Sequence, residues 1–139
     1  MPDKFVIRLY NENDRQQVIE LWNECLLLVP QNDPVKDIRL KTAFQPELFF
    51  VGCTGKRIIA SLMAGYEGHR GWLNYLAVHP VYRKQGIGRA IVFHALEQLK
   101  ALGCPKVNLQ VRNFNSGVIE FYKKLGFAID DVMSMGLRF

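Results

Sequence analysis

Residues 72–103 constrain the fold more than any other part of the chain, because a strand, a glycine-rich loop and a long helix follow one another there. Residues 72–78 are apolar enough for a buried strand, and the loop after them holds two glycines among polar and cationic residues. Apolar side chains then recur at helical spacing, at Ile87, Ile91, Ala95, Leu99 and Leu102. Gly103 and Pro105 predict where this helix ends. The succession indicates an α/β protein.

The loop before the helix predicts a phosphate site. The first N–H groups of a helix have no intrahelical partner, and the helix dipole places positive charge at the same end. Gly86 and Gly88 carry no Cβ, so an anion can approach the backbone. Mobile positive charge surrounds them, from Arg83, Lys84 and Arg89. Neither common nucleotide fingerprint is present, since Ile91 stands where a third glycine would complete Gly-x-Gly-x-x-Gly. An ordinary strand-to-helix turn is the alternative interpretation.

The composition indicates a single domain over residues 1–139. The chain has 139 residues, 49% of them hydrophobic, which suffices for one core but not for two. Its net charge of +5 suits a polyanionic ligand. Nucleic acid is an unlikely alternative partner, because the basic residues form no arginine-rich tract and no recognisable nucleic-acid motif.

Cysteine usage and the absence of targeting signals predict a cytoplasmic protein with no membrane partner. Cys25, Cys53 and Cys104 show no C-x-x-C spacing, and we interpret them as buried thiols of a reducing compartment. Nucleophilic catalysis by one of them is the less favoured alternative. The N-terminus has no signal-peptide core, and no apolar run approaches about 18 residues.

The first half of the chain predicts two helices and a strand meander. Asn13 is the expected N-cap of a helix that Pro30 ends. Asp33 is the expected N-cap of a second helix, with Pro34 in its first turn and its end near Phe44. Strands are expected at 4–10, 48–53, 57–66 and 72–78.

The second half predicts one more strand, a helix and a terminal pair of strands. Residues 106–111 alternate with a period of two, as a half-buried strand does. Asn115 or Ser116 is expected to cap a helix that Gly126 ends. Residues 127–139 divide at an Asp-Asp pair into two short predicted strands.

The glycine-rich stretch carries a family resemblance. The pattern R-x-x-G-x-G at residues 83–88, preceded by LAVHP at 76–80, resembles the acetyl-CoA motif of the GNAT superfamily of N-acetyltransferases. The expected element order is similar to the GNAT fold from end to end. The passages at 32–34 and 65–71 further resemble small bacterial YpeA-type single-domain acetyltransferases. The resemblance implies a mixed, mostly antiparallel sheet with helices on both faces.

The resemblance also implies which residues hold acetyl-CoA, the acetyl donor, and it implies no metal. The strand before the loop would bulge away from its neighbour, so that its backbone binds the pantetheine arm and the thioester oxygen, at Leu76, Ala77 and Val78. The pyrophosphate would lie on the loop, formed by Arg83, Lys84, Gln85, Gly86, Ile87, Gly88 and Arg89. Asn115 would touch the cofactor arm. A plain core strand and a plain helix cap are the alternatives for residues 76–78 and for Asn115.

Tyr122 stands where GNAT enzymes place the tyrosine that protonates the departing thiolate of coenzyme A. A phenol remains protonated at neutral pH and so can act as the acid. A core aromatic side chain is the alternative reading of Tyr122.

The general base is less defined, because the glutamate that many GNAT enzymes carry on the strand at 72–75 is missing. Glu67, His69 and Asp33 are the candidates for the base and for the surface that binds the acceptor, with Glu67 the residue we assign as catalytic. A solvated turn and a helix cap are the alternatives.

Together these features predict an N-acetyltransferase that moves the acetyl group of acetyl-CoA to a primary amine of a small molecule or protein. A non-catalytic acyl-CoA-binding regulatory module is the alternative. The chain is expected to be a monomer or a homodimer.

Overall fold

The computed structural model describes residues 4–139 of the chain and contains five strands and four α-helices. In chain order these are β1 (Phe5–Leu9), α1 (Arg15–Glu24), α2 (Pro34–Ala43), β2 (Phe49–Thr54), β3 (Arg57–Tyr66), β4 (Gly71–Val78), α3 (Ile87–Ala101), β5 (Val107–Leu109) and α4 (Ser116–Lys124). Short 3₁₀ turns at Glu12–Asp14, Pro46–Leu48 and Pro80–Tyr82 join some of them.

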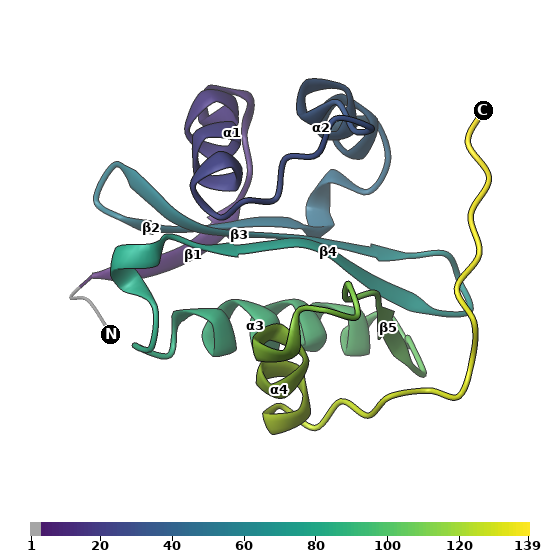
Figure 1. The fold of residues 1–139 in the computed structure, drawn as a ribbon. Coiled ribbons are helices and arrows are strands. Elements are labelled where there is room, and N and C mark those ends of the chain that lie inside the picture. The colour runs from purple at the N-terminus through teal and green to yellow at the C-terminus, as the bar shows by residue number, and fades with distance from the viewer. Residues whose placement is uncertain (1–3) are drawn as a thin grey trace.

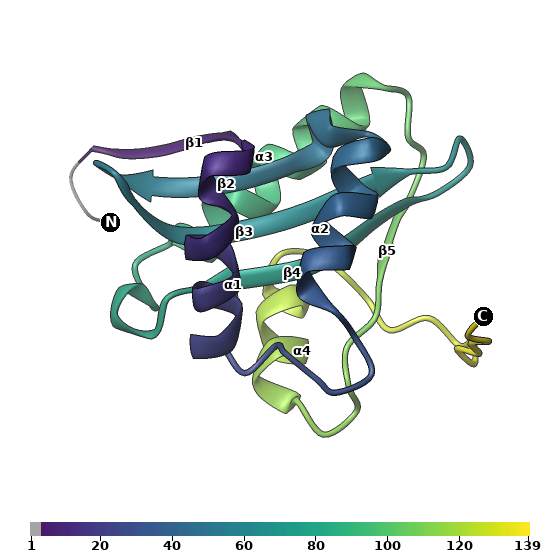
Figure 2. The same ribbon diagram turned by 90° about the horizontal axis from the view of Figure 1, so that it is seen from above.

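The strands form one sheet in the order β1-β2-β3-β4-β5. The first four strands are antiparallel neighbours, and β5 joins β4 in parallel. Helices α1 and α2 cover one face of the sheet, while α3 and α4 lie on the other (Figure 1 and Figure 2). The expected mixed, mostly antiparallel sheet with helices on both faces is confirmed.

Each face of the sheet has its own apolar core, because alternate strand residues point to opposite faces. On the α3 side, Phe50, Ile59 and Leu62 pack with the buried stripe of α3, which includes Ile91 and Leu99. The opposite core joins α1 and α2 to the sheet and contains Val18, Leu21, Trp22, Ile38, Phe49 and Val51. The expected stripe on α3 is thus confirmed at Ile87, Ile91, Ala95 and Leu99, whereas Leu102 follows the last helical residue and is exposed.

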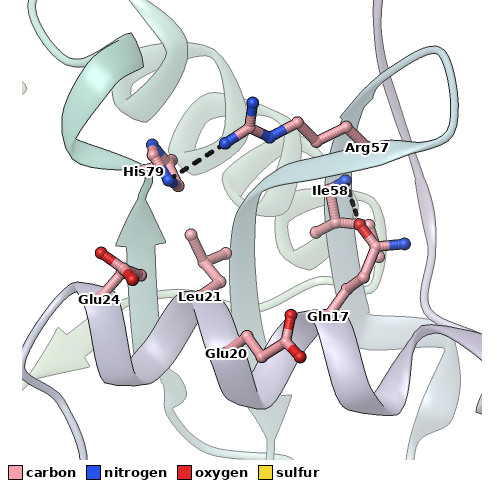
Figure 3. A pocket seen from close by; sticks show the side chains of 7 residues that line it. All are labelled: Gln17, Glu20, Leu21, Glu24, Arg57, Ile58 and His79. Carbon is pink, nitrogen blue, oxygen red and sulfur yellow. Dashed lines mark hydrogen bonds between the residues drawn. The ribbon is translucent and has the colours of Figure 1, made fainter.

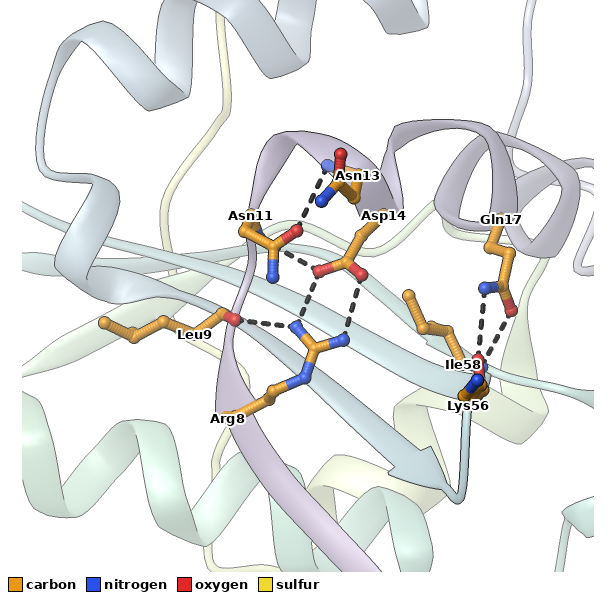
Figure 4. A network of polar contacts seen from close by, with 8 residues as sticks. All are labelled: Arg8, Leu9, Asn11, Asn13, Asp14, Gln17, Lys56 and Ile58. Carbon is orange, nitrogen blue, oxygen red and sulfur yellow. Dashed lines mark hydrogen bonds and ion pairs between the residues drawn. The ribbon is translucent and has the colours of Figure 1, made fainter.

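The start of α1 differs from the prediction at Asn13. Asn11 instead caps the 3₁₀ turn at Glu12–Asp14 that leads into α1: its Oδ1 accepts the Asn13 N–H at 3.1 Å, while the Asp14 carboxylate accepts the Asn11 N–H at 2.9 Å. Asp14 is the N-cap residue of α1 itself. Arg8 of β1 holds Asp14 with two hydrogen bonds, of 2.6 and 2.9 Å (Figure 4). Three of residues 11–14 (Asn-Glu-Asn-Asp) are of types that commonly cap helices, so the sequence alone does not show which of them is the cap.

Helix α1 also ends earlier than Pro30 predicts. Leu26 adopts a left-handed backbone with φ of 58°, and the Leu27 N–H closes the helix end on the Trp22 carbonyl at 2.9 Å. The chain therefore leaves the helix direction before it reaches the proline.

The other predicted helix ends agree with the structure. Asp33 Oδ1 accepts the N–H groups of Val35 and Lys36 at 3.0 and 3.3 Å. Asn115, and not Ser116, caps α4. Gly103 and Gly126 follow α3 and α4 with φ of 86° and 103°, in the left-handed region that glycine adopts readily.

The C-terminal segment departs from the prediction, because none of residues 127–139 forms a strand. The segment leaves α4 and runs past the end of the sheet as an extended, exposed tail (Figure 1). Its apolar side chains lie in solvent, including Ile129, Val132, Met133, Met135, Leu137 and Phe139. β5 spans only three residues and therefore offers too few free backbone N–H and C=O groups for the predicted terminal strands to pair with. Polar contacts hold the tail instead, such as Lys106 Nζ to Asp130 at 2.8 Å and Arg138 to the Gln31 carbonyl at 3.1 Å.

Candidate active site

Strand β4 is irregular at the point where it approaches the glycine-rich loop. Its register against β3 shifts between the pairs Met63–Asn74 and Ser61–Ala77, so β4 carries an extra residue there. Tyr75 lies in this bulge with a φ of 53°. β5 pairs only with Gly71–Leu73, so the following part of β4, up to Val78, has no partner on that edge. The backbone of residues 74–78 is thus open on one side.

Side chains from α1 and α2 hold the bulge. The Trp22 ring stacks on Tyr75 with centroids 3.9 Å apart, and the Tyr75 hydroxyl donates to Asp37 Oδ2 at 2.6 Å. Ser61 links the two, because its Oγ accepts from Trp22 Nε1 at 2.9 Å and donates to the Tyr75 carbonyl at 3.2 Å. Burial, together with the bond to Asp37, raises the pKa of Tyr75. The phenol is therefore a stable donor across the neutral range.

The glycine-rich loop lies directly before α3, as predicted. Lys84 and Gly86 have φ of 63° and 83°, and this left-handed backbone turns the chain into the helix. Arg83, Lys84, Gln85 and Gly86 are exposed, while Ile87 is buried and anchors the first turn.

The Arg83 Nε donates to the Val78 carbonyl at 3.0 Å, which ties the loop to the end of β4. The guanidinium of Arg89 lies over the Phe93 ring, 4.7 Å from its centroid.

Helix α4 meets this loop through Phe121 and Gly88. A Cβ added at Gly88 would lie 3.2 Å from Phe121 Cζ and 3.5 Å from Val78 Cγ2. The first distance is shorter than most Cβ contacts in proteins, and the second is an ordinary van der Waals contact. The lack of a side chain at Gly88 therefore allows α3, α4 and the end of β4 to approach one another closely. Leu76, Val78 and Tyr122 all belong to this packed cluster.

Tyr122 is buried in the same cluster, with 7% of its surface exposed. Its ring meets Phe121 and Phe127 edge to face, at centroid distances of 5.1 and 5.3 Å. Burial raises the pKa of Tyr122, so its hydroxyl stays protonated at neutral pH. Tyr122 therefore packs in the core, as the alternative reading of the sequence expects, and its neighbour Phe121 contacts Gly88 of the loop. Asn115 lies at the start of α4, where its Oδ1 accepts the Val118 N–H at 3.4 Å.

The residues expected on the acceptor side do not form one surface. Glu67 and His69 share the β3–β4 turn, with Oε1 and Nδ1 3.9 Å apart. Asp33 caps the N-terminus of α2, whereas Gln45, two residues after the other end of that helix, bonds the backbone of Tyr66 beside the turn. Asp33 is therefore about a helix length away, roughly 15 Å for ten residues.

Glu67 is engaged by its own turn. Its Oε1 accepts the backbone N–H groups of Arg70, at 2.7 Å, and of His69. These bonds, with the Arg70 N–H as the largest cause, lower the pKa of Glu67. A carboxylate with a lowered pKa is a weaker base, so the geometry favours a role for Glu67 in the turn over proton transfer.

Sequence reasoning missed the residues around the bulge. They line an open pocket of about 350 Å³ between α2 and strands β3 and β4, formed by Asp37, Leu40, Lys41, Phe44, Met63, Asn74 and Tyr75. The sequence predicted the helix that carries Asp37, Leu40 and Lys41, but it could not show that this side of α2 borders a cavity.

A second pocket, of about 210 Å³, lies between α1 and the ends of β3 and β4 (Figure 3). Its polar side chains are partly engaged: the Gln17 amide bonds the Lys56 carbonyl and the Ile58 N–H, and Arg57 lies 3.3 Å from His79 Nε2. The His79 Nδ1 accepts the Val81 N–H at 3.2 Å. These contacts brace the β2–β3 turn and the segment after β4.

Within residues 4–139 no group of three or more histidine, cysteine, aspartate or glutamate side chains is arranged to hold a metal ion. No helix in this described part of the chain is long and apolar enough to cross a membrane.

The sequence and the fold of the chain have counterparts in known proteins. Residues 15–127 match the family described as Acetyltransferase (GNAT) family. A Yersinia pestis protein named acetyltransferase is 44% identical over 132 residues, covering 95% of this chain and 94% of the relative. The chain therefore belongs to the GNAT acetyltransferase family.

Solved structures agree with this assignment. A Trypanosoma brucei acetyltransferase superposes with a TM-score of 0.71 at 26% identity, over 96% of this chain and 100% of the other. A chain from the NatC complex bound to Gag peptide and CoA reaches a TM-score of 0.78 at 23% identity, over 89% of this chain and 84% of the other, and so shows the shared fold.

Proposed function

We propose that the protein transfers the acetyl group of acetyl-CoA to a primary amine. The observation that carries this proposal is the continuity of β4 with the loop: a bulged strand with an open edge leads directly into an exposed, cationic loop at the N-terminus of α3. An extended thioester arm needs backbone partners along a strand, and its diphosphate needs N–H groups and positive charge next to them. One continuous stretch of the chain offers both.

In this proposal the backbone of Leu76, Ala77 and Val78 binds the arm and the thioester oxygen. The loop from Arg83 to Arg89 binds the diphosphate, with Gly86 giving access to the backbone and Gly88 allowing Phe121 to pack against the start of α3. Support comes from the exposure of the loop and from the unpaired edge of β4. We also propose that Asn115, which caps α4, touches the arm.

The reaction requires one nucleophile and two proton transfers. The neutral amine attacks the thioester carbonyl carbon, the C–S bond breaks, and the amide and the thiolate of coenzyme A form. The amine nitrogen loses a proton, and the thiolate gains one. Tyr122 is the proposed donor to the thiolate, because its hydroxyl stays protonated at neutral pH and its side chain belongs to the cluster that contains Val78 and Leu76. A base that acts through water is consistent with the engaged state of Glu67.

A panel of primary amines incubated with acetyl-CoA tests the proposal, with release of free thiol as the measured signal. Acetylation of at least one amine well above the rate of hydrolysis is expected. Tight binding of acetyl-CoA without turnover of any amine, peptide or aminoglycoside would favour a non-catalytic acyl-CoA-binding module. Failure of acetyl-CoA to bind would remove the basis of both interpretations.

A further inference from the structure

The pocket between α2, β3 and β4 lies on the sheet face that α1 and α2 cover, and its residues have no role in the cofactor site described above. Its volume of about 350 Å³ is at the lower end of the range for small-molecule sites. Asn74 and Tyr75 form one wall, and they are the first two residues of the part of β4 with an open edge. A ligand in this pocket therefore lies next to the strand on which the thioester is proposed to lie.

Two opposite charges border the pocket, one helical turn apart on α2. Asp37 uses Oδ2 to accept the Tyr75 hydroxyl at 2.6 Å, and its Oδ1 makes no hydrogen bond within residues 4–139. Lys41 donates to the Ala64 carbonyl, and no carboxylate of the described chain lies within 4 Å of its Nζ. The two side chains thus do not neutralise each other, although neighbours at this spacing on a helix often do.

The charge on Lys41 is only partly compensated by the protein. The side chain is half-buried, and burial lowers its pKa, an effect that the charge of Glu47 opposes. A half-buried ammonium with one neutral acceptor gains from an anionic partner, because charge-assisted hydrogen bonds are shorter and stronger than those to neutral groups.

The remaining wall of the pocket is apolar. Leu40 and Phe44 leave 58% and 66% of their surfaces exposed, and Met63 lies beneath them as a buried residue. Two large exposed apolar side chains next to a cavity provide a surface for the hydrocarbon part of a ligand.

We propose that this pocket binds the acceptor and that the acceptor is an aminocarboxylate with an apolar body, such as a hydrophobic amino acid. Asp37 binds the amino group on the side of β4, Lys41 binds the carboxylate, and Leu40, Phe44 and Met63 contact the apolar part. An acceptor that arrives as an ammonium ion loses one proton to water before the neutral amine attacks the thioester. This inference rests on the proposed acetyltransferase function and specifies the substrate class of that same site.

The test compares L-phenylalanine with 2-phenylethylamine, which has the same amine and ring but no carboxylate. With acetyl-CoA and the full chain, kcat/KM should be about 10-fold to 100-fold higher for L-phenylalanine, as one charge-assisted contact provides. Lys41→Met should remove this preference by lowering only the value for L-phenylalanine. Asp37→Asn, which keeps an acceptor for the Tyr75 hydroxyl, should lower the values for both amines. Lys36→Met is the matched control, because Lys36 lies exposed on α2 and does not line the pocket.

Several results would overturn the inference while leaving the acetyltransferase function intact. These are equal or better use of 2-phenylethylamine, an equal effect of Lys41→Met on both amines, or the same effect from Lys36→Met. If neither amine is acetylated, calorimetry of L-phenylalanine with the protein–coenzyme A complex decides: heat that disappears in Lys41→Met supports the inference, and no binding at millimolar concentration overturns it. Failure of acetyl-CoA itself to bind would overturn both proposals.

Discussion

Tyr122 is a core residue for which we also propose a role in the site. Its ring packs between Phe121 and Phe127, while Phe121 also covers Gly88 of the loop. A helical apolar stripe predicts such packing from the sequence alone, but proximity to the loop depends on how α4 crosses α3. The packing was therefore predictable from the spacing, whereas the proton-donor role came from the family resemblance.

Tyr122→Phe should lower turnover by about 10²-fold to 10⁴-fold, because general acid catalysis contributes this much, while the binding of acetyl-CoA should stay nearly unchanged. The ring and its contacts remain. Single-turnover rates should be measured beside kcat, so that the chemical step is seen directly. Tyr66→Phe, which removes a hydroxyl bonded to the Gly68 carbonyl, is the control and should leave the rate unchanged. An unaltered chemical step in Tyr122→Phe would refute the assigned acid.

Asp14 is the clearest case of a charged residue that serves the fold. Burial raises the pKa of its carboxyl, but the hydrogen bonds from Arg8 and from the Asn11 backbone outweigh burial and hold the pKa below its usual value. A lowered folded-state pKa adds stability above the unfolded pKa of about 3.9, and this stability is lost as the pH falls through the folded value.

Asp14→Asn should therefore lower the free energy of unfolding at pH 7 by about 1 to 3 kcal/mol, since it weakens a buried, charge-assisted network. The difference between the parent and the variant should shrink as the pH falls below about 4. Urea unfolding at a series of pH values measures both effects. A difference that stays constant down to low pH would show that the ionised carboxylate is not the stabilising species.

At the scale of elements, the sequence predicted those parts whose signals are local. The meander β2–β4, the start of α2 at Asp33 and the end of α3 at Gly103 follow from turn residues and periodicity, and all are present. The predicted cap of α1 and the predicted strands at 127–139 were wrong. The start of α1 depends on Arg8 of β1, which holds Asp14, and strands at 127–139 would need a sheet edge longer than the three residues of β5 to pair with. The pocket at Asp37 and Lys41 was missed for the same reason, since the packing of α2 on the sheet decides what its side chains border.

Gly88→Asp tests the junction of β4, α3 and α4. It should abolish the thermal stabilisation by acetyl-CoA, because it places a negative charge at the helix N-terminus where the diphosphate is proposed to bind. The contact with Phe121 should also cost the free protein about 1 to 3 kcal/mol. Gly88→Ala adds the same Cβ without the charge and should keep most of the stabilisation. Normal cofactor binding by Gly88→Asp would mean that the loop is only a turn.

At the scale of the whole molecule, the proposed cofactor site lies between β4, α3 and α4, whose side chains pack in one apolar cluster. β5 pairs with β4 only at Gly71–Leu73, so it does not hold the rest of β4. A ligand that contacts all three elements stabilises the folded state, since it binds that state alone. Folding and cofactor binding are thus linked by mass action.

Acetyl-CoA at about 100 times its dissociation constant should add roughly 2.7 kcal/mol to the stability of the fold, which for a chain of this size raises Tm by roughly 8 °C. Differential scanning fluorimetry with a series of acetyl-CoA concentrations measures the rise. Desulfo-coenzyme A should give a similar shift, because the diphosphate and most of the arm are the same. No shift at millimolar cofactor would contradict the site.

The exposed tail after α4 gives the protein a built-in chemical reporter. Met133 and Met135 leave 85% and 91% of their surfaces open to solvent, whereas Met63 leaves 7%. Mild peroxide should therefore convert the two tail thioethers to sulfoxides long before it reaches Met63. Peptide mass spectrometry over time would record this order in the free chain and in any assembly. Slow oxidation at Met133 and Met135 would reveal that another surface shields the tail in solution.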